Sequence, residues 1–144
     1  MAFDPSKVIN GTFGSVQLNG DDIANIIALE ATVSIDKEDV KQCGTLAKGY
    51  KVTGIEGKGT IKCNKVDTRF GKLISGNLSE GKDTTCTIVS TLEDPDSDGT
   101  ESVQLNNCKF DKLTVADWEA RKLGEESYDF TFESWQYLST IDPE

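Results

Sequence analysis

The sequence contains no histidine among its 144 residues. Histidine is the usual general base, the partner of nucleophilic serine and cysteine, and the commonest zinc ligand. Carboxylate pairs such as Glu125 and Glu126 remain as acid/base candidates, but their surroundings predict a solvated turn. We therefore expect a protein that is not an enzyme and that needs no cofactor.

Positive charge is also scarce. Only Arg69 and Arg121 are arginines among 15 basic residues, against 25 acidic ones, so the net charge is -10 and the isoelectric point is near 4.5. Binding nucleic acid through its phosphates needs clustered lysine and arginine, which this composition disfavours. Such acidity still suits a surface past which DNA slides, because the surface repels DNA.

Long apolar runs are missing as well. No stretch approaches the roughly 18 apolar residues of a membrane span, and the opening residues MAFDPSKVINGTFG lack the basic and apolar regions of a signal peptide. We expect a protein made in the cytoplasm that does not itself bind membranes. The four cysteines are too widely spaced for a CxxC pair and are expected as reduced, partly buried thiols: Cys43, Cys63, Cys86 and Cys108.

Alternation of apolar and polar residues with a period of two runs through most of the chain. The strands predicted from it are Ser15–Leu18, Ile27–Asp36, Val52–Val66, Thr84–Leu92, Glu101–Phe110, Leu113–Trp118 and Ser127–Trp135. The turn residues Asn19 and Gly20 predict a hairpin after the first strand. Apolar residues at helical spacing behind Asp67 or Thr68 predict one short amphipathic helix that ends near Leu78.

These patterns predict a mainly β fold, a β-sandwich or partial barrel of antiparallel strands with one short flanking α-helix. We expect a single domain over residues 1–144, with flexible termini at 1–10 and 138–144. Residues 37–51 follow neither period and predict a long loop, and loops of that length are usually functional. Glycines 54, 57 and 59 predict bulges or a close backbone approach in the next strand.

The run Asp94-Pro95-Asp96-Ser97-Asp98-Gly99 matches the first half of a calcium loop. The twelfth position, where a bidentate glutamate is needed, is Leu105. We therefore predict an acidic turn and no metal site, with weak calcium binding by Asp94, Asp96 and Asp98 left as a hypothesis.

Several runs of the chain together resemble one family. They are GTFGSVQLNGDDIANIIALEATVSIDKEDVKQCG, GYKVTGIEGKGTIKCNKV, GTESVQLNNCKFDKLTV and EESYDFTFESW, in order from about Gly11 to Trp135. This resembles the tail tube proteins of PBSX-like prophages and of contractile-tailed phages. Each piece is short, and the specificity lies in their combination.

The resemblance implies a structural subunit that forms hexameric rings stacked into the inner tube of a contractile phage tail or tail-like bacteriocin. The channel would pass DNA or an effector, with DNA only as a passenger. The implied partners are further copies of the chain, the tail sheath protein and a tape measure protein inside the tube. The implied location is the virion tail or a tail-like particle made in the bacterial host cytoplasm.

The resemblance also implies roles for two sets of residues. The loop at 37–51 is expected to order on contact with the adjacent ring, through Lys41, Cys43, Gly44, Leu46 and Tyr50. The channel is expected to be lined either by Glu30, Thr32, Ser34 and Asp36 or by Glu56, Lys58, Thr60 and Lys62. A register error of one residue would exchange the faces, so both assignments stay open.

Two other functions remain open. One is a secretion-system tube subunit with the same architecture. The other is a monomeric β-barrel that binds a small ligand, which predicts aromatic side chains around one opening. The aromatic residues instead occur at core-like spacing in the C-terminal strands, which favours packing: Trp118, Tyr128, Phe130, Phe132 and Trp135.

Overall fold

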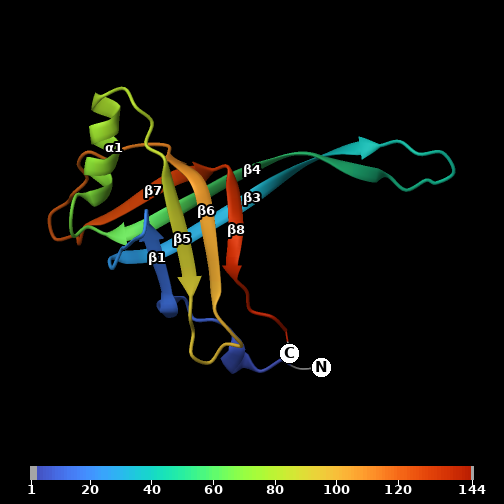
Figure 1. Cartoon of the computed structure of the whole chain (residues 1–144), viewed down its shortest axis with the longest axis horizontal. Helices are drawn as coiled ribbons and strands as arrows, with labels where there is room; N and C mark the ends of the chain where they lie inside the picture. Colours follow the sequence, from blue (N-terminus) through green and yellow to red (C-terminus); the bar gives the residue numbers. More distant parts are fainter. Residues whose placement is uncertain (1–2, 144) are drawn as a thin grey trace.

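The computed structural model describes residues 3–143 and consists mainly of antiparallel β-strands (Figure 1). Its elements are η1 (Pro5–Lys7), η2 (Gly11–Phe13), β1 (Gly14–Leu18), β2 (Asp21–Asp22), β3 (Ile26–Val40), β4 (Gly49–Asn64), α1 (Arg69–Ser79), β5 (Cys86–Leu92), β6 (Glu101–Phe110), β7 (Glu125–Phe132) and β8 (Ser134–Ser139). The prediction of a mainly β fold with one short flanking α-helix is confirmed.

The strands form two antiparallel sheets that share β6. This strand pairs with β5 along one edge and with β8 along the other, while its last two residues pair with β7. From β7 the second sheet continues through β4 to β3. Figure 1 shows β3, β4 and β7 running across the direction of β5, β6 and β8. The chain passes between the sheets at Glu133, which separates β7 from β8.

A single core lies between the sheets and α1. Its buried side chains are Val16, Leu18, Ile23, Ile61, Cys63, Phe70, Ile74, Cys86, Ile88, Leu105, Cys108, Tyr128, Phe130 and Phe132. Burial of each large apolar side chain contributes about 1.5–3 kcal/mol to the stability of the fold. The two sheets therefore stabilise each other through this apolar burial, and all four cysteines are free thiols.

The helix α1 packs on the core through the predicted apolar stripe. Phe70 stacks on Tyr128 with ring centroids 4.9 Å apart, and Ile74 is buried one turn later. The Asp67 carboxylate accepts a hydrogen bond from the backbone N–H of Arg69 (3.2 Å), whereas the Thr68 side chain makes no capping bond. Of the two predicted capping residues, Asp67 therefore supplies the acceptor.

The glycines of β4 allow close packing against β7. A Cβ atom at Gly59 would lie 2.4 Å from the Phe130 ring, and one at Gly57 would lie 2.5 Å from the Phe132 ring. Each glycine is paired directly with the phenylalanine that covers it. The predicted close approach is thus to the chain's own aromatic side chains.

The loop predicted at 37–51 is shorter in the structure. Residues 37–40 belong to β3 and residues 49–51 to β4, so the loop itself covers residues 41–48. A register shift between Asp36 and Lys37 changes the pairing, and the β3 residues directly beyond it, Lys37, Glu38 and Asp39, are polar on both faces. Alternation therefore disappears from the sequence while the hydrogen-bond ladder continues.

The strand predicted at Leu113–Trp118 is wrong, because the β6–β7 connection (residues 111–124) contains no strand. The prediction that Trp118 lies in the core is also wrong, since its side chain is exposed. Phe110 at the end of β6 pairs with Phe130 in the later part of β7, so the connection runs back to the start of β7 at Glu125, and no described strand pairs with it.

The ends of the chain are partly ordered by the fold. β8 extends to Ser139, which pairs with Ser102, so the segment predicted as flexible from 138 begins inside a strand. At the other end η1 and η2 lie within or beside the segment predicted as flexible at 1–10. Residues 1–2 and 144 of these predicted termini lie outside the described residues.

Candidate functional site

The β3–β4 hairpin projects far beyond the rest of the molecule (Figure 1). Its inner part is held by β7, which pairs with β4 from Gly57 to Asn64. In the outer hairpin (residues 34–56), β3 and β4 pair only with each other among the described strands. The far edge of β3 has no strand partner in the described chain either. These edges present unused backbone donors and acceptors, which can pair with another chain.

One face of the hairpin is polar along its whole length. The register pairs Glu30 with Thr60, Thr32 with Lys58, and Ser34 with Glu56. Directly paired residues of neighbouring strands share a face. The two sets proposed as alternative channel linings, one on β3 and one on β4, therefore lie on the same face of one ribbon.

This polar face continues onto β7. Lys58 is paired with Thr131 and Thr60 with Asp129, and the Thr60 hydroxyl donates to the Asp129 carboxylate at 2.8 Å. A groove of about 320 Å³ runs over the inner part of this face. The face carries carboxylates at Glu30, Asp36, Glu56 and Asp129 and ammonium groups at Lys58 and Lys62. Its charge is mixed in sign with an acidic excess.

The opposite face of the outer hairpin is mainly apolar and exposed. Ile35 is paired with Ile55, and Lys37 and Asp39 alternate onto the same face opposite Val52 and Tyr50. More than half of the surface of Ile35, Tyr50, Val52 and Ile55 is accessible to solvent. The Lys37 ammonium lies 5.5 Å from the centre of the Tyr50 ring, a cation–π contact on this face. Further in, the same face covers the core through Leu29 and Val33.

The predicted ring-contact residues gather at the end of the hairpin. Lys41, Cys43, Gly44 and Leu46 lie in the loop, Tyr50 lies in β4, and all five are exposed. Gly44 has φ +85°, a conformation that glycine adopts without strain. Sequence reasoning thus placed these five residues in one region, while their contact with a partner stays a prediction.

A partly buried polar cluster lies at the inner end of β4. The Tyr128 hydroxyl donates to the Glu126 carboxylate at 2.9 Å, and the Lys65 ammonium pairs with the same carboxylate. Burial, followed by the Glu126 contact, raises the pKa of the Tyr128 hydroxyl. Glu126 therefore lies in a strand and an ion pair, not in the solvated turn expected for it. Sequence reasoning missed this cluster because Lys65 and Glu126 are 61 residues apart.

The buried thiols are poorly suited to nucleophilic chemistry. Burial raises the pKa of Cys63 and Cys86, and it raises the pKa of Cys108 to about 12. They are therefore neutral at physiological pH, and the thiolate is the reactive form. Cys43 is the exposed cysteine.

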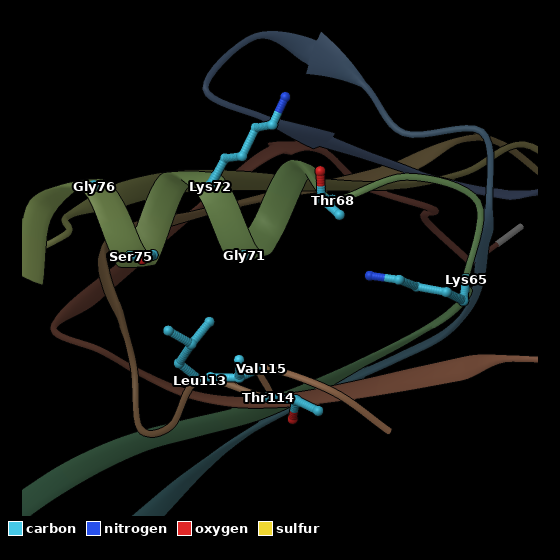
Figure 2. Close-up of a pocket in the computed structure, with 9 residues that line it drawn as sticks. All are labelled: Lys65, Thr68, Gly71, Lys72, Ser75, Gly76, Leu113, Thr114 and Val115. Atoms are coloured by element: carbon cyan, nitrogen blue, oxygen red, sulfur yellow. The ribbon is translucent and has the colours of Figure 1, made fainter. Parts of the chain in front are cut away.

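A cleft of about 520 Å³ separates α1 from the start of the β6–β7 connection (Figure 2). Its lining combines Lys65 and Lys72 with small polar residues of the helix and the apolar side chains of Leu113 and Val115. Figure 2 shows Lys72 pointing away from the connection. These residues contain no carboxylate and no nucleophile paired with a base, so the cleft offers no catalytic arrangement.

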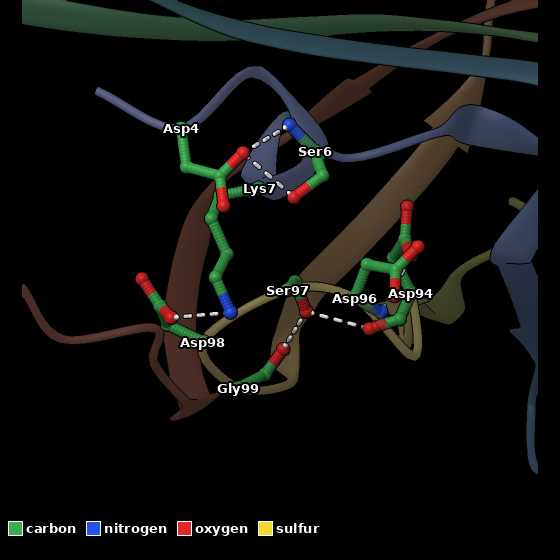
Figure 3. A network of polar contacts seen from close by, with 8 residues as sticks. All are labelled: Asp4, Ser6, Lys7, Asp94, Asp96, Ser97, Asp98 and Gly99. Atoms are coloured by element: carbon green, nitrogen blue, oxygen red, sulfur yellow. Dashed lines mark hydrogen bonds and ion pairs between the residues drawn. The ribbon is translucent and has the colours of Figure 1, made fainter. Parts of the chain in front are cut away.

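The acidic run at 94–99 forms a closed turn that holds the N-terminal segment (Figure 3). The Asp94 carboxylate accepts hydrogen bonds from the backbone N–H groups of Asn10 (2.8 Å) and Asp96 (2.9 Å), which lower the pKa of Asp94. Asp98 pairs with the Lys7 ammonium at 3.4 Å. The carboxylates of Asp94 and Asp98 thus accept from the chain's own donors, as expected of an acidic turn. Over residues 3–143 the structure contains no group of three or more acidic or cysteine side chains arranged to hold a metal ion.

In the part of the chain that the structure describes, α1 and the short 3-10 turns are not long and apolar enough to cross a membrane. The candidate functional surface of the described chain is the projecting hairpin, with its free edges and its two contrasting faces.

Comparisons with known proteins agree with this geometry. Residues 1–139 match the family model described as phage tail tube protein. The Phage-like element PBSX protein XkdM of Bacillus subtilis (strain 168) is 35% identical over 138 residues, covering 94% of this chain and 93% of the relative.

Solved structures of low sequence identity share the fold. The anti-feeding prophage tube-terminating cap matches with a TM-score of 0.74 at 11% identity, over 97% of this chain and 95% of that one. A chain of the sheath–tube complex of an extracellular contractile injection system, in the extended state, matches with a TM-score of 0.73 at 10% identity, over 96% and 100%.

Proposed function

This chain belongs to the phage tail tube protein family, and from that membership we propose that it forms hexameric rings that stack into the hollow inner tube of a contractile phage tail or tail-like bacteriocin. The family is structural and is not an enzyme family. The channel of the tube serves the passage of DNA or an effector. The whole chain acts as a single tube domain.

The unpaired edge of β3 carries this proposal. β3 is fifteen residues long and ends the sheet on that side. A long exposed edge promotes uncontrolled aggregation unless a defined partner covers it. A ring of identical subunits supplies that partner at every edge, and closure into a barrel leaves no free strand within the ring.

The polar face of β3, β4 and β7 lines the channel in this proposal. Both predicted sets of residues then face inward together, because the hairpin register puts them side by side. The acidic excess of that face repels DNA weakly, and its lysines keep the repulsion modest. DNA is accordingly a passenger and not a bound ligand.

The same proposal includes the contacts of the tube with its other components. The hairpin loop, with Lys41, Cys43, Gly44, Leu46 and Tyr50, contacts the adjacent ring and becomes ordered there. The outer wall of the tube contacts the tail sheath protein, and a tape measure protein occupies the channel during assembly. Hydrogen exchange in monomer and tube tests the ordering: equal protection of residues 37–51 in both would contradict it.

Electron microscopy of the purified protein at increasing concentration tests the assembly directly. The expected result is six-fold rings and hollow tubes. A chain that stays monomeric at all concentrations would overturn the proposal.

A gold label tests which face lines the channel. In a Cys43→Ser background, Thr32→Cys carries a maleimide gold cluster on the polar face, and Lys82→Cys carries it on the exposed turn after α1. The Thr32 label should appear on the tube axis and the Lys82 label away from it. The opposite pattern would reverse the assignment of the face.

A further inference from the structure

The β6–β7 connection exposes three large apolar side chains almost completely. Val115 is 87% exposed, Trp118 86% and Leu123 90%. Single exposed apolar side chains are normal on a surface, whereas adjacent ones mark interaction sites, and Trp118 and Leu123 line one groove together. Trp118 is the strongest of the three signals, because tryptophan is enriched among the residues that dominate binding energy.

This connection is held in place by the fold at both ends. Leu113 packs against the core, and the Asp111 N–H donates to the Asp129 carbonyl at 2.9 Å. At the other end the Gly124 carbonyl accepts from the Lys65 N–H at 2.8 Å. The exposed side chains are therefore carried by an anchored segment, which limits the entropy that a partner must remove on binding.

The second exposed apolar surface is the outer hairpin, and it lies at the opposite end of the molecule. Figure 1 shows the hairpin reaching one end of the long axis, with α1 and the β6–β7 connection at the other. Two different surfaces at opposite ends are what a head-to-tail contact between identical copies requires. A stack of such copies covers the apolar side chains of both surfaces.

Charge favours the same pairing. The hairpin tip (residues 37–51) contains four lysines and two carboxylates and is net positive, in a chain of net charge -10. Trp118 and Leu123 border a groove of about 500 Å³ whose lining includes four carboxylates and two lysines. One of these carboxylates, Glu126, is already paired with Lys65. The basic tip and the acidic groove attract each other, while the acidic bodies of two copies repel.

We propose that the β6–β7 connection is the surface of one ring that receives the hairpin of a second copy in the adjacent ring. Tyr50, Val52 and Ile55 pack on Trp118 and Leu123, and the lysines of the tip lie beside the groove. This inference rests on the proposed tube and adds to it the residues on the receiving side.

Chemical cross-linking in assembled tubes tests the contact. In a Cys43→Ser background, Thr53→Cys beside the apolar hairpin face is combined with Glu119→Cys beside Trp118. A bismaleimide should then join successive copies into a ladder of dimers, trimers and longer chains. The matched control combines Thr53→Cys with Lys82→Cys and should give no ladder.

The outcomes separate this inference from the proposed function. Tubes that form without the ladder, or with an equal ladder in the control, overturn the contact and leave the tube intact. A wild-type chain that never forms tubes overturns both.

A substitution gives an independent readout. Trp118→Gln should leave the unfolding midpoint of the monomer unchanged, because the side chain is exposed, and should raise the concentration needed for tube formation at least about tenfold. Leu78→Gln, at an exposed apolar position of α1, should change neither. An unchanged assembly concentration for Trp118→Gln would contradict the proposal.

Discussion

The inner part of the β3–β4 hairpin and the outer part as far as Asp36 share one alternation and one register but have different surroundings. In the inner part the apolar face is covered by the chain's own aromatic side chains, and Ile61 is fully buried. In the outer part Ile35 and Ile55 continue that face and are exposed. Alternation therefore indicates which face is apolar, but it does not indicate whether the same chain or another copy covers it.

The largest contrast between the two parts should come from removing an aromatic side chain. Phe130→Ala removes the fully buried β7 ring that covers the inner part and should lower the free energy of unfolding by about 3–5 kcal/mol. Tyr50→Ala in the outer part should change it by less than about 0.5 kcal/mol. Urea unfolding of the monomer measures both. Equal losses would show that the outer face is already covered within one chain.

Glycine substitutions should give the next largest contrast. A Cβ at Gly59 would lie 2.7 Å from the Glu30 carbonyl oxygen as well as against Phe130, so Gly59→Ala should cost about 1–3 kcal/mol. At Gly54 the nearest atom is the Asp36 Oδ2 at 3.5 Å, an ordinary contact. Gly54→Ala should therefore be close to neutral in the same unfolding experiment. An unchanged free energy of unfolding for Gly59→Ala would mean that the Phe130 ring and the backbone at Glu30 can both move aside.

Two ion pairs, one beside the inner part of the hairpin and one in the outer part, give a third comparison. Lys65→Met leaves the largely buried Glu126 carboxylate without its cation and should cost about 1–2 kcal/mol. Lys58→Met breaks an exposed pair with Glu56 and should cost at most about 0.5 kcal/mol. Thermal unfolding at low and high salt checks this, since salt should screen the exposed Lys58–Glu56 pair more than the Lys65–Glu126 pair. An equal cost for the two variants would contradict the prediction.

The smallest effect concerns pH. The backbone N–H groups of Asn10 and Asp96 hold the pKa of Asp94 below its ordinary value, so its contribution to stability is present above pH 4. That contribution is lost as the pH falls through the lower, folded-state pKa. The stability difference between wild type and Asp94→Asn should thus shrink as the pH is lowered from 7 towards 3. A difference independent of pH would show that the carboxylate charge plays no part in holding the turn.

Sequence reasoning predicted the elements whose pattern is local. The strand at Glu101–Phe110 and the helix behind Asp67 are determined by alternation, spacing and capping within a few residues. The β6–β7 connection was predicted wrongly because Leu113 and Val115 alternate like a strand, yet no strand lies beside them to pair with. Pairing is a long-range property, which a short pattern does not contain.

The candidate surfaces were predictable to a similar extent. The polar sets on β3 and β4 could be listed from alternation, but their location on one face required the register between Glu30 and Thr60. The exposure of Trp118 could not be predicted, because tryptophan at that spacing is normally buried.

The pairing of β4 with β7 also determines how the molecule bears mechanical load. A pull on the hairpin tip along its strands acts parallel to β4, so the ladder from Gly57 to Asn64 is loaded in shear. The backbone hydrogen bonds of that ladder lie perpendicular to the strands and resist the pull together, not one after another. A pull of this kind can therefore detach the hairpin from β7 only if the backbone hydrogen bonds of the β4–β7 ladder break together.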